Sequence, residues 1–271
     1  MHPMLVAPLA AAALALAIAL PAAAQSAPPK PPASKPTAAM PAPTADAVAV
    51  KKLVEERFPG VQVRYIAKAP FLGLYEAMFD DQMIYVDPKA AYIFVGNVYD
   101  TKTKTNLTER KARELNRIAW SELPLNLAIR KVKGNGSRRL AVFSDADCPF
   151  CQRLEETLKG IDDVTIYTFL YPIDQLHPDA ARKSKLIWCA PDKVKAWDEF
   201  FTSGVLPAND GECDNPIAAT NTLGKKLKIN ATPTLVFADG SLVPGALPAA
   251  QLEAEFKQAE AALSKPVAAK K

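Results

Sequence analysis

The second half of the chain alternates between short apolar runs and longer amphipathic stretches. Runs rich in β-branched and aromatic residues predict strands over residues 140–144, 164–170, 234–237 and 241–243. Apolar residues at three- and four-residue steps, together with cap signals, predict helices over residues 152–159, 179–189, 194–202, 215–227 and 249–263. Asp239-Gly240 predicts a hairpin turn between the last two strands. These elements make one domain of mixed helix and sheet.

The first half predicts a smaller domain over residues 46–107. It opens with a helix over residues 46–58 that Pro59-Gly60 ends. Strand-like runs follow at residues 61–66, 72–79, 82–86 and 92–95, with Asp80-Asp81 as a hairpin turn. So small a sheet with one helix has a thin core, and such domains often need support from oligomerisation. An exposed sheet edge would pair with a second copy of the chain.

Residues 108–123 have helical periodicity that Pro124 ends, and they lie between the two predicted domains. This helix is either a connector between domains or part of a core. The polar residues 130–139, which include Gly134 and Gly136, favour the connector.

The N-terminal residues predict an export signal. Residues 5–20 are apolar and Ala22-Ala23-Ala24 provides an A-x-A cleavage site, although no Lys or Arg precedes the apolar run. An uncleaved membrane anchor is the alternative, and Pro8 and Pro21 disfavour a spanning helix. We therefore expect a signal peptide over residues 1–24 and a disordered Pro/Ala-rich spacer over residues 25–45. The net charge of +4 is too dispersed to indicate nucleic-acid binding.

The main candidate for chemistry is Cys148-Pro149-Phe150-Cys151, between a predicted strand and a predicted helix. A helix N-terminus stabilises a thiolate, which is the reactive form of cysteine, and Cys151 lies about one turn further on. Pro149 suits the first helical turn. The alternatives are a structural disulfide and half of a zinc site, whose other ligands would come from Cys189, Cys213, His2 and His177. None of these repeats a short ligand spacing, so the pattern favours a redox-active dithiol without a metal.

An exported protein with four cysteines is expected to pair them. If Cys148 pairs with Cys151, Cys189 is left for Cys213, and this second bridge is structural. His177, beside Pro178 in a predicted loop, is interpreted as a surface residue. A strand, a dithiol, a helix, a strand, helices, a hairpin and a helix follow the order of a thioredoxin fold.

From about residue 46 to its closing helix, the chain resembles the DsbC/DsbG family of periplasmic disulfide isomerases. Four stretches carry most of the resemblance: Val142-Phe143-Ser144-Asp145, Ile187-Trp188-Cys189-Ala190, Ala231-Thr232-Pro233-Thr234 and Asp239-Gly240-Ser241-Leu242-Val243-Pro244-Gly245. The resemblance implies an α+β dimerisation domain over residues 46–107, a linker helix over residues 108–131, a thioredoxin-like domain with an inserted helical segment over residues 132–265, and a tail over residues 266–271.

The resemblance also implies a V-shaped homodimer in the periplasm and a cis peptide at Thr232-Pro233 beside the dithiol, in a loop that binds substrate. The implied activity is disulfide isomerisation or reduction in misfolded exported proteins. Cys148 would attack, Cys151 would resolve the mixed disulfide, no cofactor would be needed, and a membrane reductase of the DsbD type would supply electrons. The alternatives are a DsbG-like reductase of single oxidised cysteines, a net thiol oxidase, and a holdase chaperone.

Three residues are expected to tune the dithiol. Pro149-Phe150 differs from the Gly-Tyr of the best-known isomerases, and Phe150 lacks the charge of the histidine found in strong oxidases, which predicts a less oxidising couple. The carboxylate of Asp147 would raise the pKa of Cys148, unless it faces solvent and is screened.

Overall fold

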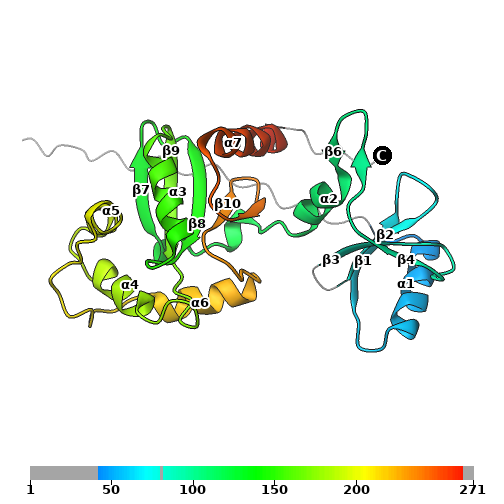
Figure 1. Cartoon of the computed structure of the whole chain (residues 1–271), viewed down its shortest axis with the longest axis horizontal. Helices are drawn as coiled ribbons and strands as arrows, with labels where there is room; N and C mark the ends of the chain where they lie inside the picture. The colour runs from blue at the N-terminus through cyan, green and yellow to red at the C-terminus, as the bar shows by residue number, and fades with distance from the viewer. Residues whose placement is uncertain (1–41, 80–81, 265–271) are drawn as a thin grey trace, which may run out of the picture. The chain divides into compact units, whose positions relative to one another are not determined.

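The computed structural model describes residues 42–79 and 82–264 (Figure 1). The predicted signal peptide, most of the spacer, the Asp80-Asp81 turn and the tail lie outside these residues. No helix among the described residues is long and apolar enough to cross a membrane.

The N-terminal domain is one helix and a four-stranded antiparallel sheet. Helix α1 (Ala45–Arg57) packs Ala47, Val50 and Val54 into the core. The strands pair in the order β1-β2-β3-β4, which is also their chain order. Their bounds are β1 (Val63–Lys68), β2 (Tyr75–Phe79), β3 (Gln82–Val86) and β4 (Ile93–Val95).

Two details of this domain differ from the sequence prediction. The side chain of Thr44 accepts a hydrogen bond from the backbone N–H of Ala47 at 3.3 Å, so the last two residues of the predicted spacer cap and begin α1. A short hairpin of β5 (Tyr99–Asp100) and β6 (Thr105–Asn106) was not predicted. Two-residue strands are too short to show a period.

The prediction of one linker helix over residues 108–131 is wrong in its extent. Helix α2 (Leu107–Leu115) ends at Leu115, and the chain continues through two 3₁₀ turns, η1 (Trp120–Glu122) and η2 (Leu125–Leu127). Ile118, Trp120 and Leu123 are buried in the core of the C-terminal domain. These apolar residues are spaced as in a helix because they pack into that core, although the backbone there is not helical. The backbone N–H of Ile118 donates to the carbonyl of Gly240, in the predicted hairpin turn, at 2.9 Å.

The polar stretch over residues 130–139, which favoured a connector role for the preceding helix, is partly a strand. Strand β7 (Ile129–Lys133) forms the edge of the C-terminal sheet and runs antiparallel to β9 (Val164–Leu170). An edge strand with one solvent-facing side tolerates the alternating polar residues that hid it.

The C-terminal domain is a five-stranded mixed sheet in the order β11-β10-β8-β9-β7. Strand β8 (Arg138–Ser144) lies at its centre, parallel to β9 and antiparallel to β10 (Thr234–Phe237). Strand β11 (Leu242–Pro244) completes the predicted hairpin with β10. Leu140, Ala141, Val142 and Phe143 are fully buried, so β8 is covered on both faces.

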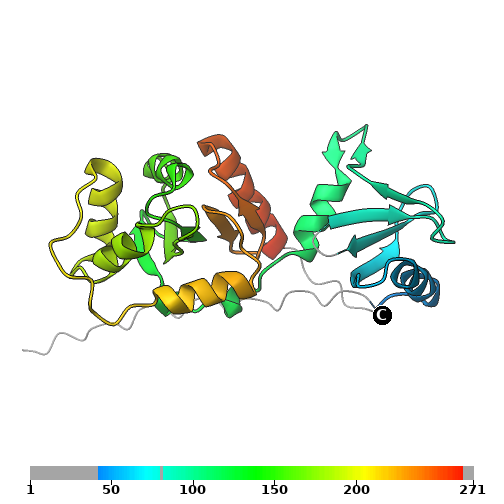
Figure 2. The same ribbon diagram turned by 60° about the horizontal axis from the view of Figure 1, so that its bottom comes forward.

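Helices cover both faces of this sheet (Figures 1 and 2). On one face, α3 (Pro149–Lys159) and α7 (Ala249–Ser264) pack against β8, β9 and β10. On the other, α6 (Ile217–Lys226) and the segment after α2 surround the stacked rings of Phe143 and Phe169. Two further helices, α4 (Ala180–Trp188) and α5 (Lys193–Ser203), form the inserted helical segment. The domain has the predicted thioredoxin-like architecture.

Candidate active site

Cys148 lies at the junction between the central strand and the first helix of the C-terminal domain, as predicted. Strand β8 ends at Ser144, Cys148 is the N-cap residue of α3, and Pro149 is its first helical residue. Proline fits there because the first N–H groups of a helix have no partner within the helix. Cys148 is 4% exposed and Cys151 is fully buried, and both are free thiols in the structure.

The surroundings of the two sulfurs act in opposite directions. Hydrogen bonds from Cys151 and Thr232, and the backbone N–H groups of Cys151 and Phe150, lower the pKa of Cys148 below its ordinary value. Burial, and then the neighbouring Cys148, raise the pKa of Cys151. These opposite shifts favour a thiolate at Cys148 and a protonated thiol at Cys151.

The predicted cis-proline loop lies beside the nucleophile. The peptide bond Thr232-Pro233 is cis, and Sγ of Cys148 lies 3.3 Å from the carbonyl oxygen of Thr232. The loop is held by Gly245, whose backbone N–H donates to the carbonyl of Pro233 at 2.7 Å. The cis-proline loop therefore borders the nucleophile.

The other two cysteines form the expected bridge. Cys189 and Cys213 are disulfide-bonded with their Cα atoms 5.6 Å apart, and the bond joins the end of α4 to the loop before α6. Because both sulfurs are used, they are not available as zinc ligands to the Cys148 dithiol. Among residues 42–79 and 82–264 there is no cluster of three or more His, Cys, Asp or Glu side chains arranged to hold a metal ion.

Comparison with known proteins identifies the family. A family model described as the disulfide bond isomerase protein N-terminal domain matches residues 38–109, and a thioredoxin-like domain matches residues 125–260. The probable thiol:disulfide interchange protein DsbC of Bordetella parapertussis is 39% identical over 81% of this chain and 77% of that protein. The chain belongs to the DsbC/DsbG family of thiol:disulfide interchange proteins.

Two further proteins with similar descriptions match the chain. The thiol:disulfide interchange protein DsbC of Escherichia coli K12 is 27% identical over 77% of this chain and 86% of that protein. A disulfide interchange protein of Neisseria gonorrhoeae, known from a crystal structure, is 47% identical over 51% of this chain and 99% of that chain, with a TM-score of 0.49. The activity of this DsbC/DsbG family member is thiol:disulfide oxidoreduction.

Asp147, next to the nucleophile in sequence, is paired with a lysine and is not free in solvent. Its carboxylate forms an ion pair with Lys183 of α4, and each side chain is 22% exposed. Lys183 also contacts Asp179 at 3.6 Å. The charge of Asp147 is therefore screened by Lys183 and not by solvent alone. The two residues are 36 positions apart, so the sequence pattern did not indicate their contact.

His177 lies at the active site, which corrects its interpretation as a surface residue. Nδ1 of His177 is 3.0 Å from Oδ2 of Asp145, a residue with no exposed surface. Asp145 also connects to the dithiol, because its backbone N–H donates to Sγ of Cys151 at 3.4 Å. No local motif joins a strand-end aspartate to a histidine 32 residues later, so this pair could not be predicted from the sequence.

A groove runs beside the nucleophile. A cavity of about 430 Å³ is lined by Cys148, Pro149, Gln152 and the end of α5 from Phe200 to Gly204. The ring of Phe150 is 52% exposed next to it, with the guanidinium of Arg153 5.4 Å from the ring centre. Asp147 also lines this cavity, so the reacting sulfur faces both neutral groups and the ion pair of Asp147 with Lys183.

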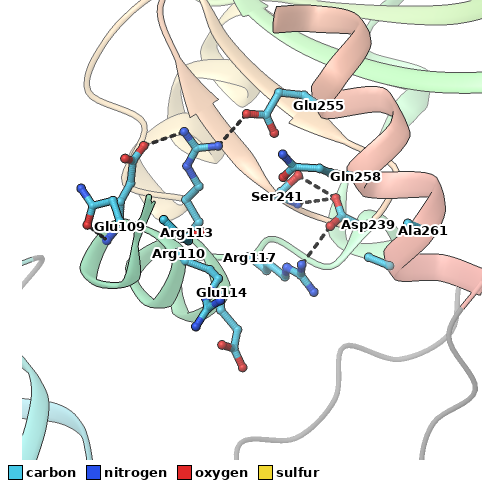
Figure 3. Close-up of a pocket in the computed structure, with 13 residues that line it drawn as sticks. Glu109, Arg110, Arg113, Glu114, Arg117, Asp239, Ser241, Glu255, Gln258 and Ala261 are labelled. Atoms are coloured by element: carbon cyan, nitrogen blue, oxygen red, sulfur yellow. Dashed lines mark hydrogen bonds and ion pairs between the residues drawn. The ribbon is translucent and has the colours of Figure 1, made fainter. Parts of the chain in front are cut away.

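A second cavity, of about 620 Å³, lies between α2 and α7 (Figure 3). Its walls are joined by ion pairs, Arg113 to Glu255 at 2.6 Å and Arg117 to Asp239 at 3.0 Å. None of the four cysteines lines it. Its charges stabilise the contact between α2 and the C-terminal domain, and we assign it no part in the thiol chemistry.

Proposed function

We propose that the protein is a disulfide isomerase and reductase of misfolded exported proteins in the periplasm. The observation that carries this proposal is the pair of opposite environments at Cys148 and Cys151. An isomerase needs a nucleophile that attacks readily and a second thiol that waits. Lowering the pKa of Cys148 and raising that of the buried Cys151 supports this division.

In the proposed reaction the Cys148 thiolate attacks one sulfur of a wrong disulfide. A bond forms between Cys148 and that sulfur, the substrate disulfide breaks, and the other substrate sulfur leaves as a thiolate. In isomerisation, a different substrate thiolate then attacks the mixed disulfide and releases Cys148 unchanged. In reduction, Cys151 loses its proton, bonds to Cys148 and releases the substrate as a dithiol. A membrane reductase of the DsbD type would then return the protein to its reduced form.

We infer that the protein acts as a homodimer through its N-terminal domain. The match to the isomerase N-terminal domain over residues 38–109 supports this. So does the sheet edge, where β4 pairs with β3 alone among the described residues and exposes Phe94 and Val95 by 52% and 62%. An apolar edge of this kind favours pairing with another strand. Sedimentation of the full chain should give twice the monomer mass of 29.2 kDa, less any cleaved leader.

Refolding of scrambled ribonuclease tests the activity. The wild-type protein should restore ribonuclease activity in a buffer without excess oxidant. Cys148→Ser should lose this activity completely, and recovery at the wild-type rate in that variant would overturn the proposal. Cys151→Ser, which keeps the nucleophile, should keep part of the isomerisation and accumulate mixed disulfides.

The alternatives give different results in companion assays. A reductase of single oxidised cysteines would reduce a sulfenic acid substrate and leave scrambled ribonuclease unchanged. A net oxidase would form disulfides in reduced ribonuclease without rearranging wrong ones. A holdase would suppress aggregation equally well in wild-type protein and in Cys148→Ser.

A further inference from the structure

The dipeptide between the two active-site cysteines has no charged side chain, yet the structure brings an imidazole to the dithiol from another part of the chain. His177 lies in the loop between β9 and α4. Its backbone is fixed at both sides, because its N–H donates to the carbonyl of Ile173 at 2.9 Å and its carbonyl accepts from Ala180 at 3.1 Å. The ring is therefore delivered by a folded loop, and its side chain is 21% exposed.

Asp145 holds this ring and both cysteines in one hydrogen-bonded cluster. Oδ1 accepts the backbone N–H of Asp147 at 2.8 Å, and Oδ2 accepts the backbone N–H of Ile173 at 2.8 Å and contacts His177 at 3.0 Å. The carbonyl of Asp145 accepts the backbone N–H of Cys148 at 3.2 Å. Since a carboxylate only accepts hydrogen bonds, Nδ1 of His177 carries the proton in this contact.

We propose that His177, held by the buried carboxylate of Asp145, is a positioning residue that places a positive charge near the Cys148 thiolate and so favours the reduced form of the dithiol. The inference deepens the proposed function, on which it rests, because an isomerase must be reduced to attack. It also supplies in space the imidazole that Pro149-Phe150 lacks in sequence. Because a favoured reduced form makes a couple more oxidising, His177 opposes the less oxidising couple expected from Phe150.

The charges around the ring agree with this assignment. The titratable groups that act on His177 are Asp145, Cys148 and Asp147, and Asp147 is itself paired with Lys183 of α4. The hydrogen bond to Asp145, and then the charges of Asp145, Cys148 and Asp147, raise the pKa of His177 against the opposing effect of burial. Coupling between two sites is reciprocal, so a thiolate that favours imidazolium is favoured by it equally.

The equilibrium with glutathione measures the effect. Oxidation of the protein by one glutathione disulfide forms the Cys148–Cys151 bond and releases two glutathione thiols. In the His177→Asn variant, which keeps an amide that can donate to Asp145 but has no charge, the reduced form should be disfavoured by about threefold at pH 6, as expected for about half a pKa unit of lost interaction. At pH 9 the wild-type imidazole is neutral, so the two proteins should agree.

Arg182→Gln is the matched control. It removes one positive charge from the same region, but Arg182 is 59% exposed and paired with Asp179. This variant should match wild type at both pH values. A difference between His177→Asn and wild type that is equal at pH 6 and pH 9, or no difference at either pH, would overturn the inference. The first result would show a structural role and the second no role.

Proton NMR provides the reciprocal measurement. The chain contains two histidines, His2 and His177, so the His177 signals can be assigned by their loss in His177→Asn. The midpoint of His177 should fall by about half a unit when Cys148→Ser removes the thiolate. An unchanged midpoint would contradict the coupling. Both measurements are independent of isomerase activity. If the protein shows the coupling but fails to refold scrambled ribonuclease, the proposed function is rejected and the coupling between His177 and Cys148 stands.

Discussion

The two cysteine pairs of the C-terminal domain lie at opposite ends of helices. Cys148 is the N-cap of α3, and Cys189 is the C-cap of α4. Unpaired N–H groups and the positive end of the helix dipole favour a thiolate at the first position, whereas unpaired carbonyl groups disfavour it at the second. The same residue type is therefore a nucleophile at one helix end and suited to a permanent disulfide at the other.

Solvent exposure alone would have predicted Cys189 and Cys213 to be the reactive pair. Cys148 and Cys151 are buried, whereas Cys189 is partly exposed and Cys213 is exposed. Reactivity at Cys148 comes from the groups that lower its pKa, not from open access to solvent. The contrast predicts separate effects when each pair is removed. Loss of the Cys148–Cys151 pair should lower activity, and loss of the Cys189–Cys213 pair should lower stability.

The largest expected effect is on activity at the first pair. Replacing Cys148 by Ala removes the attacking sulfur, so thiol:disulfide interchange should fall by on the order of a thousandfold or more, to the uncatalysed rate. The urea midpoint of reduced protein should change little, because Ala leaves only a small void. Insulin reduction and equilibrium unfolding, measured on the same preparation, check both parts. A variant that loses both together would show that Cys148 also supports the fold.

The second pair should show the reverse pattern. Replacing both Cys189 and Cys213 by Ala opens a loop of 24 residues. In the chain-entropy treatment this lowers the free energy of unfolding by roughly 3 to 4 kcal/mol. Interchange activity measured at 25 °C, where the variant is still folded, should stay within about twofold of wild type. Loss of activity in a variant shown to be folded would mean that the disulfide also shapes the active site.

Local signals made the first pair predictable. The strand before Cys148 and the proline after it each lie within a few residues of the dithiol. The pairing of four cysteines in an exported protein added the bridge from Cys189 to Cys213, and the family resemblance added the cis bond at Thr232-Pro233; the structure contains both. Most strands and helices were also predicted within about two residues of their ends, the usual uncertainty of boundaries.

Contacts between distant segments were not predictable in the same way. The helix expected over residues 108–123 ends at Leu115, because the apolar residues beyond it pack into the C-terminal core instead of continuing a helix. The pairing of Asp147 with Lys183 and that of Asp145 with His177 depend on how the inserted helices fold back over the end of the sheet. The pattern of apolar and polar residues along one sequence does not indicate such contacts.

A smaller effect on stability is expected next to the dithiol, at Glu155. This side chain lies one turn after Cys151 on α3, near Trp197, Lys131, Asp198 and Lys159. Burial raises its pKa to about 7 against the lowering effects of Trp197 and Lys131. Because the folded state holds the proton more tightly than the unfolded state, this group is most favourable below about pH 4.5 and loses that advantage as the pH rises to about 7.

Glu155→Gln imitates the protonated form and should therefore increase the free energy of unfolding by about 1 to 2 kcal/mol at pH 8, with little change at pH 4.5. Urea unfolding at the two pH values provides the measurement. Glu156→Gln, an exposed neighbour on the same helix, is the control and should show no such pH dependence. An equal effect of Glu155→Gln at both pH values would show that packing, not charge, is responsible. The expected result would mean that a charged Glu155 destabilises the fold one helical turn from the reactive cysteines, whereas the Cys189–Cys213 disulfide stabilises it.

The smallest expected effect is on the pKa of Cys148, through the ion pair beside it. Asp147→Asn removes a carboxylate next to the nucleophile and leaves Lys183 unneutralised, so the thiolate midpoint should fall by about half a unit. Lys183→Gln leaves Asp147 uncompensated, so the midpoint should rise by a similar amount.

The double variant should return close to wild type, because the pair is neutral as a whole. The ultraviolet absorbance of the thiolate follows each titration. Two single variants that shift the midpoint in the same direction would show that the pair acts by holding α4 in place. Opposite shifts would instead show that the inserted helices supply charge to the reactive cysteine pair.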